Sequence, residues 1–263
     1  MKDKLKIVIG VIVIIALIVI SGIVIYNGVN AQNEEIVHPV AVFDIQDYGT
    51  VKCELYPEYA PNTVSNIIAL INAGYYNNKV IYGKDDICLY MARTTEDDAE
   101  VPKISLIDDS IEADSESDYK YEINGEFIAN KFEKNTLRHE KGVLSLNRSD
   151  YSSYGLVEEG YNSGNAQFSI MMNESSNLNG VYCAFGKVTE GLEILEKIYN
   201  EAQVEENTDE TSSESSMKKF ATMPVISNAT VETYGVDYGK PETHEAFDIQ
   251  SYINELYSKY YSN

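Results

Sequence analysis

A long apolar run near the N-terminus divides this 263-residue chain into two parts. Residues 7–26 carry no charge and are almost all apolar, and a helix of that length, at about 1.5 Å per residue, spans the ~30 Å hydrocarbon core of a bilayer. Lys2, Lys4 and Lys6 precede the run, and a basic flank of this kind stays on the cytoplasmic side. We therefore expect residues 1–31 to form a signal-anchor in the cell membrane, a single-pass transmembrane helix with the rest of the chain on the extracytoplasmic side.

A cleaved signal peptide is the alternative interpretation of the same segment. Val29, Asn30 and Ala31 have the spacing of a cleavage site, and cleavage near Ala31 would release a secreted domain. The apolar run is longer than the ~7–15 residues of a typical signal peptide, which favours the uncleaved anchor.

The charge of the remaining chain limits its partners. The formal net charge is −22, and removing three lysines and one aspartate of the N-terminal segment changes it by −2, to about −24. Nucleic acid and anionic lipid are therefore poor partners for the folded part. Cys53, Cys88 and Cys183 are widely spaced and odd in number, which indicates neither a disulfide framework nor a zinc site. No sequence motif indicates a metal or another cofactor.

Short segments with one apolar face predict a mostly β domain over residues 38–236. Val40 to Ile45 and Val51 to Leu55 flank a turn and predict a β-hairpin. One helix is expected to begin at Pro61 and end at Gly74, and a second to span residues 190–199. Further strands are expected at residues 80–82, 87–91, 142–146, 167–172, 182–188 and 224–234. This order of elements indicates a closed β-barrel capped by two α-helices.

Three segments do not fit the strand pattern. Residues 94–118 and 205–216 are acidic and serine-rich, and we expect them to be surface loops inserted in the domain. Residues 240–263 form a C-terminal tail in which Phe247, Tyr252, Ile253, Leu256 and Tyr260 recur at near-helical spacing. This tail is expected to be an amphipathic helix that docks on the domain, or a short segment that binds a partner.

Three groups of motifs, in the same order along the chain, resemble a cyclophilin. Residues 49–76 contain GTV, ELYP, APNTVSN and GYY; residues 139–146 read HEKGVLSL; and residues 162–191 contain NSGNAQF, LNG and FGKVTEG. Cyclophilins are β-barrel peptidyl-prolyl cis-trans isomerases, and the resemblance covers about residues 40–235. It implies a cyclophilin-like fold, rotamase activity, and partners that are proline-containing peptide segments of exported proteins.

The resemblance also identifies where this chain departs from the family. Rotation of an X-Pro bond crosses a barrier of about 18–20 kcal/mol, and a donor to the nitrogen of the twisted amide lowers that barrier. In the family this donor is an arginine in a Phe-His-Arg run, and the matching positions here are Ile81, Tyr82 and Gly83. The catalytic arginine is thus replaced by Gly83.

The family's peptide groove maps onto eight positions of this chain. They are Gly83, Cys88, Met91, Gln167, Phe168, Ser169, Leu178 and Tyr182. Gln167, Phe168 and Leu178 match the family, whereas the other five replace the arginine, two aromatic rings, a glutamine and a histidine.

Two arginines are candidate substitutes for the missing donor. Arg93 lies two residues beyond Met91 and is expected to face the groove on an extended strand, and Arg148 stands where the family has a groove asparagine. The alternative is that both pair with nearby carboxylates. We expect an extracytoplasmic isomerase-family protein that assists folding of exported proteins, with weak or altered activity. The alternative is a catalytically inactive cyclophilin-like module that binds an extended peptide or a partner protein.

Overall fold

The computed structural model describes residues 36–94, 100–205 and 217–261, and residues 38–263 belong to one compact unit. The expected anchor at residues 1–31 lies outside the described residues, as does most of the acidic stretch 205–216. Within the described ranges, no helix has both the length and the apolar character needed to cross a membrane.

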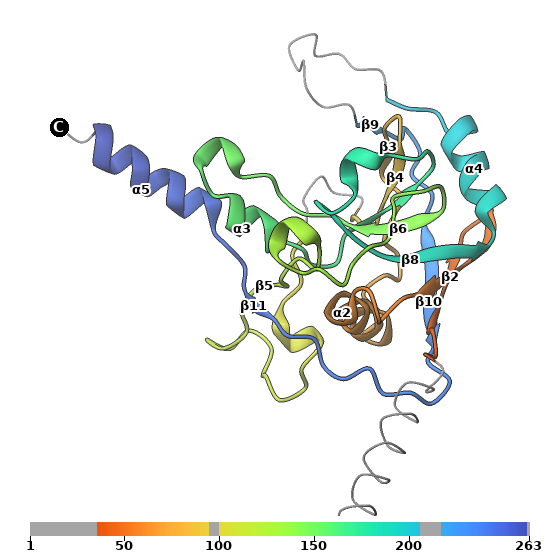
Figure 1. Cartoon of the computed structure of the whole chain (residues 1–263), viewed down its shortest axis with the longest axis horizontal. Helices are drawn as coiled ribbons and strands as arrows, with labels where there is room; N and C mark the ends of the chain where they lie inside the picture. Colours follow the sequence, from red (N-terminus) through yellow and green to blue (C-terminus); the bar gives the residue numbers. More distant parts are fainter. Residues whose placement is uncertain (1–35, 95–99, 206–216, 262–263) are drawn as a thin grey trace, which may run out of the picture. The chain divides into compact units, whose positions relative to one another are not determined.

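Nine short strands form one curled antiparallel sheet, in the order β10-β1-β2-β8-β6-β7-β4-β3-β9 (Figure 1). Their bounds are β1 Val40–Ile45, β2 Gly49–Leu55, β3 Gly83–Lys84, β4 Cys88–Met91, β6 Val143–Leu146, β7 Phe168–Met171, β8 Cys183–Glu190, β9 Lys218–Lys219 and β10 Ile226–Glu232. A closed barrel would need a full ladder of hydrogen bonds between its first and last strands. Among the described residues, only isolated bridges from Val80 to Arg93, after β4, and to Val225, before β10, lie at this point. The expected closed barrel is therefore a curled half-barrel, and the strand expected at residues 80–82 is reduced to the bridges at Val80.

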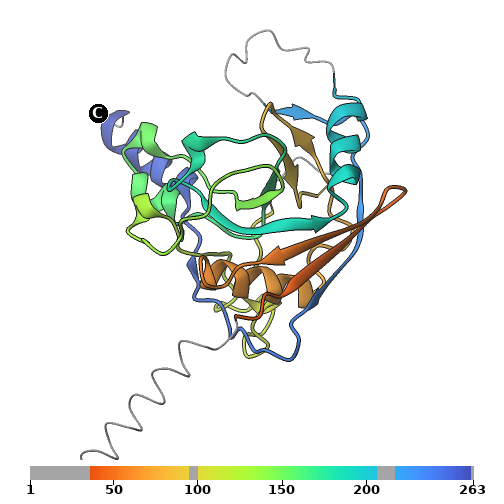
Figure 2. The same ribbon diagram turned by 45° about the vertical axis from the view of Figure 1, so that its right-hand side comes forward.

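The hairpin of β1 and β2 shows why this sequence builds a sheet with one buried face. Ala41, Phe43 and Ile45 are buried and alternate with partly exposed residues, and the register runs from Val40 opposite Glu54 to Ile45 opposite Gly49. Gly49, at the end of the turn, has φ +129°, a conformation that glycine adopts readily and other residues rarely adopt. The hairpin predicted from alternation is confirmed, and Figure 2 shows it as the long orange pair of strands.

Four α-helices lie among the described residues. They are α2 Pro61–Asn72, α3 Val157–Tyr161, α4 Leu192–Glu201 and α5 Ile249–Tyr261. Helix α2 packs against β8 and β10, and α4 packs against β2 (Figure 1). Helix α4 begins two residues later than predicted because β8 continues to Glu190 and Gly191 adopts φ +81°, where a Cβ would lie 2.5 Å from the Thr50 carbonyl oxygen.

Helix α2 is capped by a carboxylate that is distant in sequence. Ala60 at its N-terminus supplies no side-chain cap, and Glu126 Oε1 accepts from the Asn62 backbone N–H at 2.9 Å. Glu126 Oε2 accepts from the Thr63 N–H and from the Thr63 hydroxyl, both at 2.7 Å. Burial raises the pKa of Glu126, and these hydrogen bonds oppose that effect. The contact joins α2 to the chain that follows β5 (Tyr121–Glu122).

The acidic stretch that begins at residue 94 is more ordered than its composition predicts. From residue 100 onward it contains a 3₁₀ helix, Ile104–Leu106, and its Ile104 is buried in the core. Asp118 is also buried, and its carboxylate accepts from the backbone N–H groups of Ser105 and Asp114 at 3.0 and 2.7 Å. Burial opposes ionisation of Asp118, but these bonds and Lys103 lower its pKa to about 2. One anchored carboxylate thus organises a segment that has few apolar residues.

The three cysteines are free thiols buried in the domain. Burial raises the pKa of Cys88 and Cys183 to about 12 and raises the pKa of Cys53 further. Thiols with such high pKa values are poor nucleophiles at neutral pH.

Candidate functional site: a peptide groove

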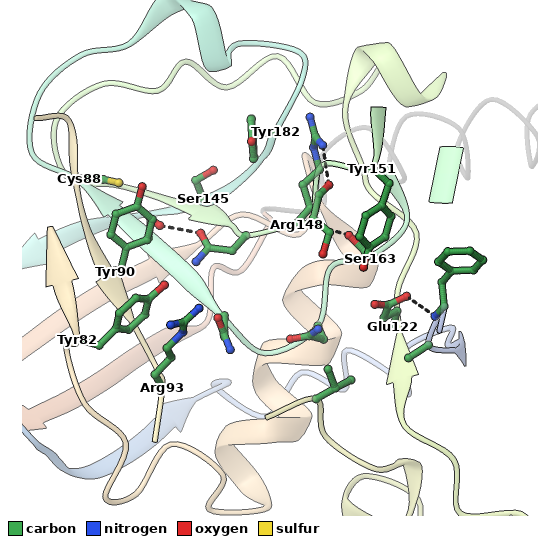
Figure 3. Close-up of a pocket in the computed structure, with 18 of the residues that line it drawn as sticks. Tyr82, Cys88, Tyr90, Arg93, Glu122, Ser145, Arg148, Tyr151, Ser163 and Tyr182 are labelled. Atoms are coloured by element: carbon green, nitrogen blue, oxygen red, sulfur yellow. Dashed lines mark hydrogen bonds between the residues drawn. The ribbon is translucent and has the colours of Figure 1, made fainter. Parts of the chain in front are cut away.

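A groove of about 1010 Å³ crosses one face of the sheet (Figure 3). Its lining comes from alternate residues of β4 and of segment 163–171 around β7, from Ser145 of β6 and the chain after it as far as Tyr151, and from Leu178 and Tyr182 before β8. Residues 119–122 around β5 and residues 245–248 of the C-terminal tail complete it. The volume is at the upper end of ordinary ligand sites, which is enough for a peptide of several residues.

One end of the groove is small and partly polar. Cys88, Ser169 and Leu178 line it, and beneath them lies a minor apolar cluster that includes Cys88 and Met171. The Ser169 hydroxyl donates to Asn147 Oδ1 at 2.6 Å. Cys88, Ser145 and Ser169 give this part of the lining less apolar surface than phenylalanine rings would.

Tyr90 is a groove residue that the sequence analysis did not single out. Its hydroxyl donates to Asp85 Oδ2 at 2.7 Å, and Asp85 Oδ1 accepts from the backbone N–H groups of Ile87 and Cys88 at 2.8 and 2.7 Å. Tyr90 pairs with Ser169 across the β4–β7 ladder and lines the groove beside it. Its place between Leu89 and Met91 in an alternating strand is the signal that could have identified it.

Arg93 reaches the groove two residues beyond the end of strand β4, where the backbone is irregular. Ala92 adopts φ +69°, and the Val80 carbonyl oxygen accepts from both the Ala92 and the Arg93 N–H groups, at 3.0 and 3.4 Å. Two successive donors on one carbonyl form a β-bulge, which shifts the alternation by one residue. Arg93 therefore lines the groove although Met91 faces the core, and the extended strand expected to continue from Met91 to Arg93 is interrupted at Ala92.

The guanidinium of Arg93 lies over an aromatic ring at the groove wall. Its central carbon is 4.3 Å from the ring centroid of Tyr82. Its Nε is buried and has no hydrogen-bond partner among the described residues, and none of the described carboxylates lies within ion-pair distance of it. Burial raises the pKa of Tyr82 to about 12, and Arg93 opposes this rise. The ring orients the guanidinium and leaves N–H donors for a ligand.

Arg148 is bound more tightly to the protein. Its Nε donates to the Val181 carbonyl at 3.1 Å and its Nη1 donates to the Ser149 carbonyl at 3.0 Å. Its guanidinium carbon also lies 4.3 Å from the Tyr182 ring centroid and 4.9 Å from that of Tyr161. Arg148 lines the groove, but its Nε and Nη1 donors already form hydrogen bonds to neighbouring segments of the chain.

The structure places Gly83 beneath β9 and outside the groove lining. Gly83 pairs with Tyr90 on one side and with Lys219 on the other. A Cβ at this position would lie 2.6 Å from the Lys218 carbonyl oxygen and 2.7 Å from the Met217 sulfur. Because strand β9 covers the position, no arginine fits there without displacing it.

Met91 and Phe168 also lie away from the groove. They face each other across the β4–β7 ladder and are buried in the main core at 1% and 0% exposure. Of the eight positions given by the resemblance, Cys88, Gln167, Ser169, Leu178 and Tyr182 line the groove. The residues that do not line it sit on the core face of a strand or under β9.

A buried histidine supports the floor of the groove. His139 Nε2 lies 3.0 Å from the Ser145 hydroxyl, and its Nδ1 lies 3.2 Å from Asn179 Oδ1. Burial lowers the pKa of His139, so the ring is neutral at pH 7. Among the residues that the structure describes, no carboxylate completes this chain of groups, and Ser145 is 4% exposed within strand β6. The arrangement connects strand β6 to the loop at Asn179.

The depressed pKa of His139 predicts a specific pH dependence. Since an unfolded histidine has a pKa of 6.5, the unfolded chain binds protons more readily as pH falls below that value, and the native state loses stability there. We expect His139→Ala to cost about 2 kcal/mol at pH 8, because it leaves the Ser145 and Asn179 groups unpaired, and less at pH 5.5. Urea unfolding of both proteins across this range measures the difference. A cost that does not change with pH would contradict the prediction.

None of the clusters of His, Cys, Asp and Glu within the described ranges could hold a metal ion. The groove lining offers hydrogen-bond donors, aromatic faces and the guanidinium groups of Arg93 and Arg148.

The fold and groove define a class of protein, a curled β-sheet domain with a surface groove large enough for a peptide of several residues. The family model for "Cyclophilin type peptidyl-prolyl cis-trans isomerase/CLD" matches residues 40–222. Because this match covers well over half of the chain, the protein belongs to the cyclophilin-type peptidyl-prolyl cis-trans isomerase family.

Individual relatives agree with this assignment. Peptidyl-prolyl cis-trans isomerase B of Bacillus subtilis (strain 168) is 29% identical over 164 residues, which is 60% of this chain and 89% of the relative. Peptidyl-prolyl cis-trans isomerase CYP23 of Arabidopsis thaliana is 26% identical over 151 residues, 57% of this chain and 56% of that protein. A crystal structure of a Cryptosporidium parvum cyclophilin type isomerase superposes with a TM-score of 0.54 at 19% identity, over 74% of this chain and 98% of the other. The same isomerase in the presence of the dipeptide Ala-Pro gives a TM-score of 0.52 at 19% identity, over 73% of this chain and 98% of that one.

Proposed function

We propose that this protein is a prolyl isomerase in which Arg93 supplies the donor that the family takes from another position. The observation that carries the proposal is the Arg93 guanidinium, which lies on Tyr82 in the groove with a buried Nε that no described residue hydrogen-bonds. The substrates would be X-Pro segments, the bond that the family's name describes, and in particular those of exported proteins.

Prolyl isomerisation needs little more than a groove that holds the peptide and one oriented N–H donor. In the twisted amide the nitrogen becomes pyramidal and more basic, so a fixed N–H donor stabilises it more than the planar ground state. Arg93 is held by its stacking on Tyr82 and retains donors, whereas Arg148 already donates to two carbonyl groups. We assign the donor role to Arg93 and a structural role to Arg148.

NMR exchange on a panel of X-Pro peptides tests the proposal with the full chain in detergent micelles. Faster cis-trans exchange at substoichiometric protein is the expected result. The competing function is a binding module, which the reduced apolar surface near Cys88 and Ser169 favours. Stoichiometric shifts without faster exchange would establish the module and overturn the isomerase.

We further propose that residues 1–31 anchor the domain on the extracytoplasmic side of the membrane. The support is the length of the apolar run and its basic flank. Protease added to intact spheroplasts should degrade the domain, and protection of the domain would contradict this orientation. Recovery of a soluble form that begins near Gln32 would instead show cleavage.

A further inference from the structure

The C-terminal tail supplies one wall of the groove. Glu245, Ala246, Phe247 and Asp248 line the groove, and His244–Glu245 forms strand β11. The family match covers residues 40–222 and does not extend to this wall.

The wall is attached to β5 by main-chain and side-chain bonds. In the antiparallel ladder His244 lies opposite Glu122, and Glu245 lies opposite Tyr121. The Ala246 N–H donates to the Lys120 carbonyl at 2.8 Å. The Phe247 N–H donates to Glu122 Oε2 at 3.1 Å, shown as a dashed line from Glu122 in Figure 3.

The base of the wall is buried and hydrogen-bonded to the core. Glu122 is only 4% exposed, and its carboxylate accepts a hydrogen bond from the Phe247 N–H. Tyr121 is fully buried and donates to Asn66 Oδ1 of α2 at 2.8 Å. Strand β5 is thus fixed to the core, and the tail segment is fixed to β5.

The wall presents an aromatic pair to the groove. The rings of Phe247 and Tyr151 lie 5.8 Å apart at 53°, and both residues line the groove and remain partly exposed. The charges nearby are mixed, since Glu245 and Asp248 face the groove together with Lys120 and Arg148. The aromatic surface is therefore the feature that distinguishes this part of the groove.

We infer that Phe247 and Tyr151 form a specificity subsite for an aromatic or aliphatic side chain that flanks the proline of a bound peptide. The inference rests on the proposed function, because it takes the groove to be a prolyl-peptide site. Burial of such a side chain against two rings supplies enough free energy for at least a tenfold preference over alanine. The tail thereby determines which segments the groove accepts.

Peptide titrations of the full chain in micelles test this subsite. The panel is one Ala-Pro core with Phe, Leu, Ala, Glu or Lys at a flanking position, and the measurement is Kd from NMR shifts. The wild type should bind Phe or Leu peptides about tenfold more tightly than the Ala peptide. In Phe247→Ala this ratio should fall below about threefold, because the loss of affinity falls mainly on the Phe and Leu peptides.

Two further variants separate the subsite from general damage to the fold. Ala246→Pro removes the N–H that binds Lys120 and should reduce the preference in the same way. Tyr154→Ala removes a tyrosine that is 47% exposed and outside the groove lining, and should leave every Kd unchanged.

The outcomes also separate this inference from the isomerase proposal. Tighter binding of all peptides by Phe247→Ala would mean that the tail obstructs the groove, and the inference would be wrong. A wild type that accelerates exchange without preferring Phe or Leu would overturn the subsite alone. Preference without faster exchange would overturn the isomerase alone, and a wild type that binds no peptide would overturn both.

Discussion

Replacement of Arg93 with alanine should lower kcat/KM for prolyl isomerisation by roughly 10²–10³, the effect of removing one preorganised donor from a comparable site. The loss should fall mainly on kcat, because the donor meets a basic nitrogen only in the twisted amide. Stability should change little, since the described contact of the guanidinium is its stacking on Tyr82. NMR exchange rates at several peptide concentrations separate kcat from KM.

Two matched arginine variants sharpen this result. Arg93→Lys keeps the charge without the planar donor fork and should recover only part of the rate. Arg148→Ala removes the bonds to Val181 and Ser149 and should lower stability while changing kcat less than tenfold. If Arg148→Ala abolished turnover and Arg93→Ala did not, the donor would be Arg148.

Much of the sheet could be predicted from local pattern. Alternation located β1 and β2, which bury one face in the core, and Pro61 located the start of α2. Strands β6 and β7 are buried throughout and were located as short, mainly apolar segments. The strands and the α-helix that were missed are β3, β5, β9, β11 and α3, which have two to five residues each. Elements this short carry no period of their own and form because partners distant in sequence lie beside them.

The groove was harder to predict because it depends on which face each residue occupies. Position matching assigned Met91 and Phe168 to the groove, whereas the β4–β7 register turns both into the core. The bulge at Ala92 then reverses the alternation for Arg93, and a positive φ at an alanine gives no sequence signal. The wall at residues 245–248 depends on pairing with β5 across more than 120 residues, which local sequence does not encode.

The position of Phe168 predicts that its loss damages folding before it affects binding. Its ring lies 5.8 to 5.9 Å from the rings of Phe43, Tyr76 and Phe185, with no exposed surface. Truncation of a buried phenylalanine to alanine costs about 3–5 kcal/mol through lost contacts and the cavity left behind. We expect Phe168→Ala to lower Tm by roughly 10 °C.

The adjacent residue provides a control on the opposite face of strand β7. Ser169→Ala removes one hydroxyl that donates to Asn147, so it should cost only about 1 kcal/mol. Because Ser169 lines the groove, this variant should change peptide Kd, whereas Phe168→Ala should bind normally in whatever fraction remains folded. Thermal unfolding and peptide titration of both variants, at a temperature where both are folded, measure this contrast. A Phe168→Ala protein with wild-type Tm and lost binding would place that ring in the groove and reverse the facing of β7 described here.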